Sequence, residues 1–275
     1  MNKKKRLIIL VCVFSIVIGF IASPLFPYLR SLSLMSVYSN YCEKNSLLET
    51  EKIELKMPSG ENWYPFVMTF NADSSFSAYS NTPDTKLTIL YNFPAFSLMK
   101  GCSGLFDEAS PYYNSFYGAY LVQREDKVPY GFSSDTLALS SEAVSSVARF
   151  DFFNLVLSEF GLSEEDEIFD YSVTSKETDL TFAGSDNWTR VSSNITVNGM
   201  AHQKNGFVTS YLQYGSPNFP VSSDFSAVKM KSIIYGKYFE EWNTSVFFYV
   251  MSPSETVCED CEKLILSRST LKSSD

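Results

Sequence analysis

The sequence predicts an α+β fold: an antiparallel multi-stranded sheet of roughly six to nine strands with two main packed helices, preceded by an N-terminal membrane segment. Three observations carry this prediction. Short β-rich runs separated by turn residues fill most of residues 52–251. Two segments repeat apolar residues at helical spacing, and a long apolar run follows a basic cluster at the N-terminus.

Composition excludes several classes of function. The chain has 275 residues, of which 45% are hydrophobic, so it can bury a large core. Its formal net charge of −9 argues against nucleic acid as a partner, because nucleic-acid binding needs a basic face. One histidine in the whole chain excludes a His-rich metal site. Phosphate-loop, dinucleotide, zinc-protease and serine-hydrolase motifs are all missing from the sequence, so no cofactor and no metal are predicted.

The N-terminus carries the clearest signal. Residues 3–6 are basic, and residues 7–22 are apolar or small throughout. A spanning helix needs about 20 apolar residues, and residues 7–26 supply that length if Ser23 and Pro24 lie at the interface. We favour an uncleaved, single-pass anchor in the cell membrane, with the basic N-terminus cytoplasmic and the rest outside. The alternatives are a signal peptide cleaved before Phe20, which gives a secreted product, and a buried core helix.

Three regions follow from this interpretation. Residues 1–29 form a cytoplasmic basic stub plus the signal-anchor helix (7–26). Residues 30–51 form a stalk or docking segment, because Pro24 and Pro27 interrupt the apolar helix and the stretch is rich in serine and tyrosine. Residues 52–275 form the exported α+β domain.

The strands of this domain are predicted from apolar runs and from alternation. Residues 53–57 alternate apolar and charged side chains with the period of a half-buried strand. Asn198-Gly199 and Asn205-Gly206 have the composition of tight hairpin turns. Further strands are expected at 65–71, 86–93, 116–124, 180–183, 189–197, 206–214, 227–235 and 245–251.

Two helices are expected to pack on the sheet. The first spans Ser140–Phe160, with a seryl cap, Gly161 at its end and an apolar face that includes Phe152. Asp151 interrupts that face, and we expect it to cap the helix or face solvent. The second begins within Ser252-Pro253-Ser254-Glu255 and continues to Lys272.

Four cysteines lie beyond the apolar run: Cys42, Cys102, Cys258 and Cys261. An even number in an exported region fits disulfides, and three pairings are open. Cys258-Glu-Asp-Cys261 also has the spacing of thiol oxidoreductases, but the carboxylates around it disfavour a thiolate. We expect these cysteines to be structural, as disulfides or free thiols; redox chemistry and a zinc site are the alternatives.

An excess of aromatic residues suggests a binding surface. Tyr112, Tyr113, Phe116 and Tyr117 lie in a stretch rich in Ser, Pro and Asn. Aromatic side chains in exposed loops suit stacking on sugars or packing against another protein. Ordinary anchoring of a loop is the alternative.

The acidic segment 163–167 is typical of a helix start, because carboxylates favour the positive end of the helix dipole. A calcium site or a glycosidase carboxylate pair is the alternative. His202 is the only imidazole available as a general base. An enzyme would therefore be indicated if Asp151, Glu164 and His202 met in one cleft.

The two ends of the domain resemble a known family. Leu55-Lys-Met-Pro-Ser-Gly-Glu-Asn-Trp63 is similar to the strand–Pro–turn–Trp opening of PsbP-like domains, and Tyr249–Ser252 with Leu264–Ser267 is similar to their last strand and helix. The resemblance covers about 30 residues and leaves out the middle of the chain. It implies an exported or membrane-linked α/β/α arrangement around an antiparallel sheet, with a non-catalytic accessory role.

Taken with the anchor, these features predict a membrane-anchored extracytoplasmic domain that binds a partner protein or an envelope glycan without catalysis. The alternative is an exported enzyme: a hydrolase built on acidic residues, or a thiol-disulfide protein that uses Cys258 and Cys261.

Overall fold

The computed structural model describes residues 3–72, 74, 76–77, 82, 84–133, 138–140, 145–147, 149–200, 212–214 and 225–273. Its centre is a seven-stranded sheet in the order β2-β3-β6-β10-β9-β8-β7, with every neighbouring pair antiparallel. The predicted α+β class and antiparallel sheet are confirmed. The strands are β2 (Trp63–Phe70), β3 (Thr85–Pro94), β6 (Phe116–Arg124), β7 (Phe169–Phe182), β8 (Ser185–Asn198), β9 (Ala227–Phe239) and β10 (Thr244–Ser252).

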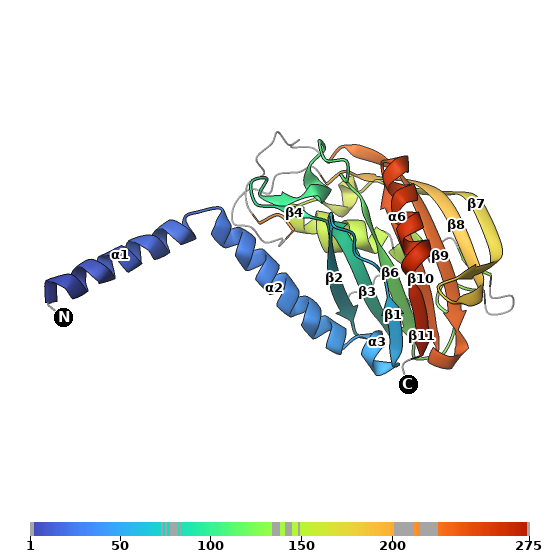
Figure 1. Cartoon of the computed structure of the whole chain (residues 1–275). Helices are drawn as coiled ribbons and strands as arrows, with labels where there is room; N and C mark the ends of the chain where they lie inside the picture. The colour runs from blue at the N-terminus through green and yellow to red at the C-terminus, as the bar shows by residue number, and fades with distance from the viewer. Residues whose placement is uncertain are drawn as a thin grey trace.

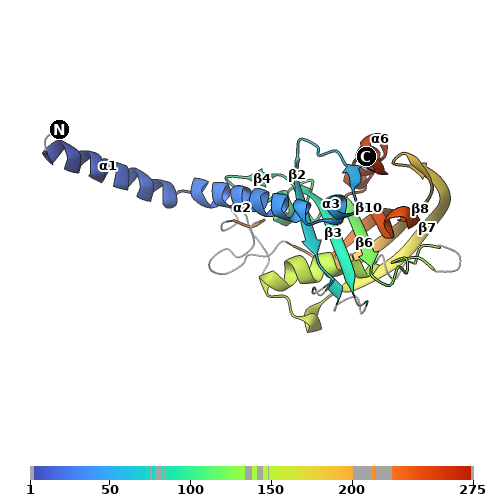
Figure 2. The same ribbon diagram turned by 90° about the horizontal axis from the view of Figure 1, so that it is seen from below.

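Both faces of the sheet are buried at its centre. All nine residues of β10 are buried, and successive side chains point to opposite faces as strand geometry requires. Phe247 and Tyr249 join the apolar cluster on one face, whereas Phe248 and Val250 join the cluster on the other. The domain therefore has three layers, and Figure 2 shows helical segments on opposite sides of the sheet.

One face is covered by a helix that ends at Phe160. It contains a π-helical segment, η2 (Phe150–Leu157), and a final 3-10 turn, η3 (Ser158–Phe160), and Gly161 closes it with a φ of 96°. The Ser140 N–H donates to the Gly131 carbonyl, and residues 145–147 are helical, so the predicted start at Ser140 stays a prediction. Residues 141–144 and 148 lie outside the described residues.

The other face is covered by α6 (Glu255–Arg268), which Ser254 caps by accepting a hydrogen bond from the Val257 N–H. The predicted start of this helix is confirmed, but its end is not Lys272. Residues Thr270–Ser273 form β11, which pairs with β1 (Ile53–Lys56). The two ends of the domain are thus joined by a small separate sheet beside α6 (Figure 1).

The segment predicted as a stalk is largely helical. α2 (Leu25–Lys44) packs against the edge strand β2, and α3 (Leu47–Thr50) follows it. The Ser39 hydroxyl accepts a hydrogen bond from the Val67 N–H at 2.8 Å, and the rings of Tyr38 and Phe66 stack at 6.0 Å. Because an unpaired edge strand invites pairing with other chains, α2 protects this edge of the sheet.

The N-terminal helix α1 (Lys3–Ile21) extends away from the sheet, and its apolar side chains are exposed (Figure 1). No single described helix is both long enough and apolar enough to cross a membrane. Together, however, α1 and the following helix, which are bent by 70° at their junction, meet that criterion by length and composition. The predicted anchor at residues 7–26 is thus only weakly indicated and stays a prediction.

Several strand boundaries differ from those predicted. β7 and β8 have 14 residues each and are joined at Ala183-Gly184, where φ is 50° and 86°. Asn198-Gly199 is not a tight hairpin, because Asn198 ends β8 and pairs with Ala227 across the segment 199–226. Most of the expected strand 206–214 lies outside the described residues. The short elements are β4 (Phe96–Ser97), β5 (Cys102–Ser103), η1 (Gly104–Phe106), η4 (Glu164–Asp166) and η5 (Glu240–Trp242).

Candidate functional site

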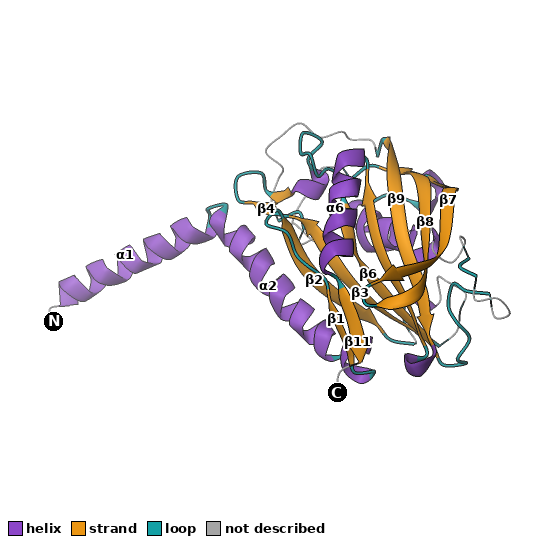
Figure 3. Ribbon diagram, turned by 45° about the vertical axis from the view of Figure 1, so that its right-hand side comes forward, coloured by secondary structure: helices purple, strands orange, loops and turns teal. Residues whose placement is uncertain are grey.

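A polar groove of about 630 Å³ lies between α6 and the outward face of strands β8 and β9. Because α6 packs on β10 and β9, the neighbouring strands beyond β9 stay uncovered on this face (Figure 3). Alternation along β8 turns Arg190, Ser192 and Asn194 toward the groove, while Val191 and Ile195 enter the core on the other face. The remaining lining residues are Thr174, Ser193, Lys231, Ser232, Ile233, Glu255, Cys258, Glu259, Glu262 and Lys263.

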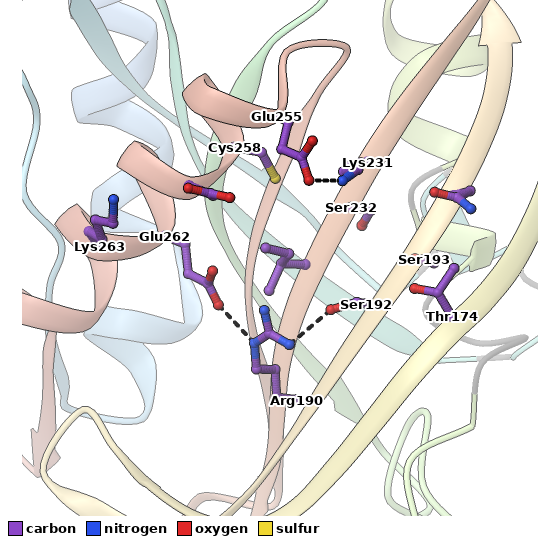
Figure 4. Close-up of a pocket in the computed structure, with 13 residues that line it drawn as sticks. Thr174, Arg190, Ser192, Ser193, Lys231, Ser232, Glu255, Cys258, Glu262 and Lys263 are labelled. Atoms are coloured by element: carbon purple, nitrogen blue, oxygen red, sulfur yellow. Dashed lines mark hydrogen bonds and ion pairs between the residues drawn. The ribbon is translucent and has the colours of Figure 1, made fainter.

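A hydrogen-bonded ion pair joins the floor of the groove to its helical wall (Figure 4). The Arg190 Nε lies 2.8 Å from the Glu262 Oε1, and the Tyr235 hydroxyl donates to the same oxygen at 2.6 Å. The Arg190 Nη1 donates to Ser192 at 2.9 Å and to Glu177 at 3.0 Å. Burial lowers the pKa of Arg190, but the hydrogen bond and charge of Glu262 outweigh it and raise that pKa above its usual range. The guanidinium is therefore a fixed positive charge.

A second ion pair lies at the opposite end of the same wall. The Lys231 ammonium on β9 pairs with the Glu255 carboxylate at the start of α6 (Figure 4). Both side chains are about half exposed or more, so this pair contributes little to stability and its charges remain accessible to a ligand. The groove thus presents alternating charges and hydroxyl groups along its length.

The two cysteines of the C-x-x-C motif are buried beside the groove. Cys258 is its only lining cysteine, and its side chain is 1% exposed. Burial, followed by the charge of Glu262, raises the pKa of Cys258 to about 12. Burial, followed by Cys258, likewise raises the pKa of Cys261 to about 12. Both groups are then neutral thiols at pH 7, whereas a redox cysteine needs an accessible thiolate.

We therefore expect neither cysteine to support thiol–disulfide exchange. The full-length chain in detergent should reduce insulin no faster than the buffer, and Cys258→Ser should behave identically. A thioredoxin-type enzyme is the positive control for the assay. Turnover that is present in the parent chain and absent from Cys258→Ser would overturn this expectation.

The expected disulfides are not formed in the structure, where all five cysteines are free thiols. Cys102 lies near Tyr214, which contacts Tyr28 at the start of α2. Cys42 is 14 residues further along α2, which corresponds to about 21 Å at the helical rise. The long-range pairing of Cys42 with Cys102 is not present in the structure, where both are free thiols.

The four predicted aromatic residues do not form one surface. Phe116 and Tyr117 are buried on opposite faces of β6, so the expectation that they are exposed is wrong. Tyr112 and Tyr113 are half-buried in the preceding turn, where the Tyr112 hydroxyl accepts a hydrogen bond from Asn62 at 3.1 Å. None of the four lines the groove. Phe116 and Tyr117 belong to the predicted strand 116–124, which β6 confirms, and not to the exposed loop before it.

Asp151 was expected to cap a helix or face solvent, and this expectation is wrong. It is 3% exposed, and its two carboxylate oxygens accept hydrogen bonds from the hydroxyls of Tyr91 and Tyr120. The ring of Tyr249 stacks on Tyr120 at 4.3 Å. Burial raises the pKa of Asp151 to about 7, although both tyrosine hydrogen bonds lower it. Asp151 is thus a core carboxyl, bonded to strands β3 and β6.

The three residues proposed to mark an enzyme do not converge among the described residues. Asp151 is inside the core, whereas Glu164 is exposed in the 3-10 turn η4. His202 lies outside the described residues. No group of three or more His, Cys, Asp or Glu in the described chain could hold a metal ion.

Comparisons with known proteins identify no relative: no family model, curated protein or solved structure matches this chain. The resemblance of its ends to PsbP-like domains is neither supported nor contradicted and stays a prediction.

Proposed function

We propose that this protein is a membrane-anchored, non-enzymatic domain that binds a partner protein on the outer side of the cell membrane. The observation that carries the proposal is α1, an apolar helix that extends from the folded domain with its side chains exposed. A helix that is apolar all round is stable only when it is buried, and a bilayer provides that environment. Residues 3–6 are basic, which favours a cytoplasmic N-terminus.

The groove beside α6 is the proposed binding site. None of its lining residues is aromatic, although stacking on aromatic rings is a common way to bind sugars. It offers instead two cation–carboxylate pairs and several hydroxyl groups, which suit the charges and amides of a polypeptide. These features favour a protein partner over a glycan.

The buried thiols of Cys258 and Cys261 support a role without catalysis. So does the pairing of Arg190 with Glu262 and of Lys231 with Glu255, because a carboxylate held by a cation is a poor general base.

A site-specific photo-crosslinker tests the binding site. In cells that express the full chain, a crosslinking residue at Glu259, which lines the groove, should give a discrete adduct. The same residue at Ser267, which is exposed on α6 but does not line the groove, should give none. Lys231→Glu places like charges opposite each other and should reduce the adduct from position 259. Because the pair is exposed, the fold should be unaffected.

The double variant Lys231→Glu/Glu255→Lys is the matched control, since it restores an ion pair with reversed order. If the adduct returns in the double variant, the loss in Lys231→Glu came from the broken ion pair. If it stays reduced, the partner requires the cation at position 231. Equal amounts of adduct from positions 259 and 267 would contradict the proposed binding site. So would an adduct from position 259 whose amount does not change with the charge of residue 231.

A further inference from the structure

The helix α2 carries an apolar stripe that no described part of the chain covers. Leu34, Val37 and Tyr41 are all exposed, and Val37 is 67% exposed. Their spacing of three and four residues places them on one side of the helix. Ser31, Met35 and Cys42 lie on the buried side, which packs toward β2. The stripe therefore borders the buried face and points away from the sheet.

The position of α2 relative to α1 indicates what covers this stripe. The two helices are bent by 70° at their junction, so α2 lies within about 20° of the plane perpendicular to α1. Transmembrane helices tilt by about 20° on average, which is enough to bring α2 parallel to the bilayer surface. Figure 1 shows α2 between the sheet and the side from which α1 approaches. The side of α2 that faces away from the sheet thus faces the membrane that would hold α1 (Figure 1).

The charges at the ends of the stripe fit a lipid surface. Lys44 follows Tyr41 by three residues and is exposed on the same side as the stripe, and Arg30, which precedes Leu34 by one helical turn, is partly buried on that side. Tyrosines favour the interface between hydrocarbon and water, and basic residues beside an apolar stripe bind anionic headgroups.

A loop beside the α1–α2 junction also lies where the membrane surface would be. The loop 98–101 forms a shallow pocket with residues 21–24 at the α1–α2 junction. Within this loop Met99 is 69% exposed. An exposed methionine beside the point where α1 would leave the bilayer is placed to enter the headgroup region.

We infer that α2 is an interfacial helix that rests on the outer surface of the membrane, with its Leu34/Val37/Tyr41 stripe among anionic lipid headgroups. The domain is then held with the edge strand β2 toward the bilayer. The groove beside α6, which lies on another part of the sheet, remains open to a partner. This inference rests on the proposed anchoring of α1.

An environment-sensitive fluorophore tests the inference. The full chain with Cys12→Ser is reconstituted into vesicles of phosphatidylcholine and phosphatidylglycerol and labelled at Val37→Cys with a nitrobenzoxadiazole dye. The buried native cysteines should react slowly. The matched control is Ser36→Cys, an exposed position on another side of the same helix. We expect a blue shift and quenching by spin-labelled lipids at position 37, and water-like emission at position 36.

The possible failures can be told apart by vesicle flotation. If the chain floats with the vesicles but both dyes report water, the inference about α2 is wrong and the anchor stands. If the chain does not float, the anchor fails and the inference with it. If the dye at position 37 is shielded but not quenched by lipid, and Val37→Cys crosslinks two copies, the stripe is a dimer interface and the inference is overturned.

Discussion

Phe152→Ala is expected to lower the free energy of unfolding by about 3–5 kcal/mol, the usual cost of truncating a buried phenylalanine. Phe152 is 1% exposed and lies in the π-helical segment η2, where its ring is 5.1 Å from that of Phe116 on the central strand β6. Removing the ring leaves a cavity between helix and sheet, which are held apart by their other contacts. Urea unfolding of the full chain in mild detergent measures the effect.

Leu155→Ala is the matched control, because Leu155 belongs to the same segment but is only partly buried. An α-helical period predicts that both residues share one face. In the π-helical segment Leu155 lies at the edge of the buried face, whereas Phe152 lies within it. We therefore expect a clearly smaller loss for Leu155→Ala. Equal losses from the two variants would show that the phase of this helix is not the one described here.

A second large effect is expected from Asp151 as the pH changes. Its pKa is 3.8 in the unfolded reference and about 7 in the folded protein, because it is buried. Between these values the folded state binds one more proton than the unfolded state, so the stability from this group is fully present below pH 3.8. It is lost as the pH rises to about 7. A pKa difference of about three units corresponds to a change of about 4 kcal/mol in the free energy of unfolding.

Asp151→Asn should remove this contribution, since an amide does not titrate. Unfolding free energies measured from pH 4 to 8 should therefore fall less steeply for Asp151→Asn than for the parent chain. Tyr120→Phe removes a hydrogen bond that lowers the pKa of Asp151. The unfolding free energy of this variant should therefore continue to fall to higher pH than that of the parent chain. Parallel pH profiles for the parent and Asp151→Asn would contradict the assignment of a raised pKa.

The sequence pattern predicts the central strands and the start of the last helix well. β6 and β10 are largely apolar runs rich in aromatic residues, as expected for strands buried on both faces. α6 begins where a seryl cap, a proline and a glutamate coincide. β7 was largely missed because residues 174–179 in its middle are all polar, although Phe169, Tyr171 and Val173 alternate with polar residues at its start.

The candidate site could not be predicted in the same way. Arg190 and Glu262 are separated by 72 residues and meet only because α6 packs on β9, the neighbour of β8. Asp151 likewise finds Tyr91 and Tyr120 through the pairing of β3 with β6. The sequence signal available was modest: Arg190, Ser192 and Asn194 alternate with core residues in a predicted strand. A polar face on a strand is ordinary until a helix turns it into a groove.

The central claim is the topology of the chain, and protease shaving of intact cells tests it most directly. With a tag at each end, the C-terminal tag should be lost from intact cells, while the N-terminal tag stays protected until lysis. If the C-terminal tag is protected in intact cells and cut only after lysis, the outer location is contradicted. A mature N-terminus at Phe20 would contradict the anchor and replace it with a secreted product.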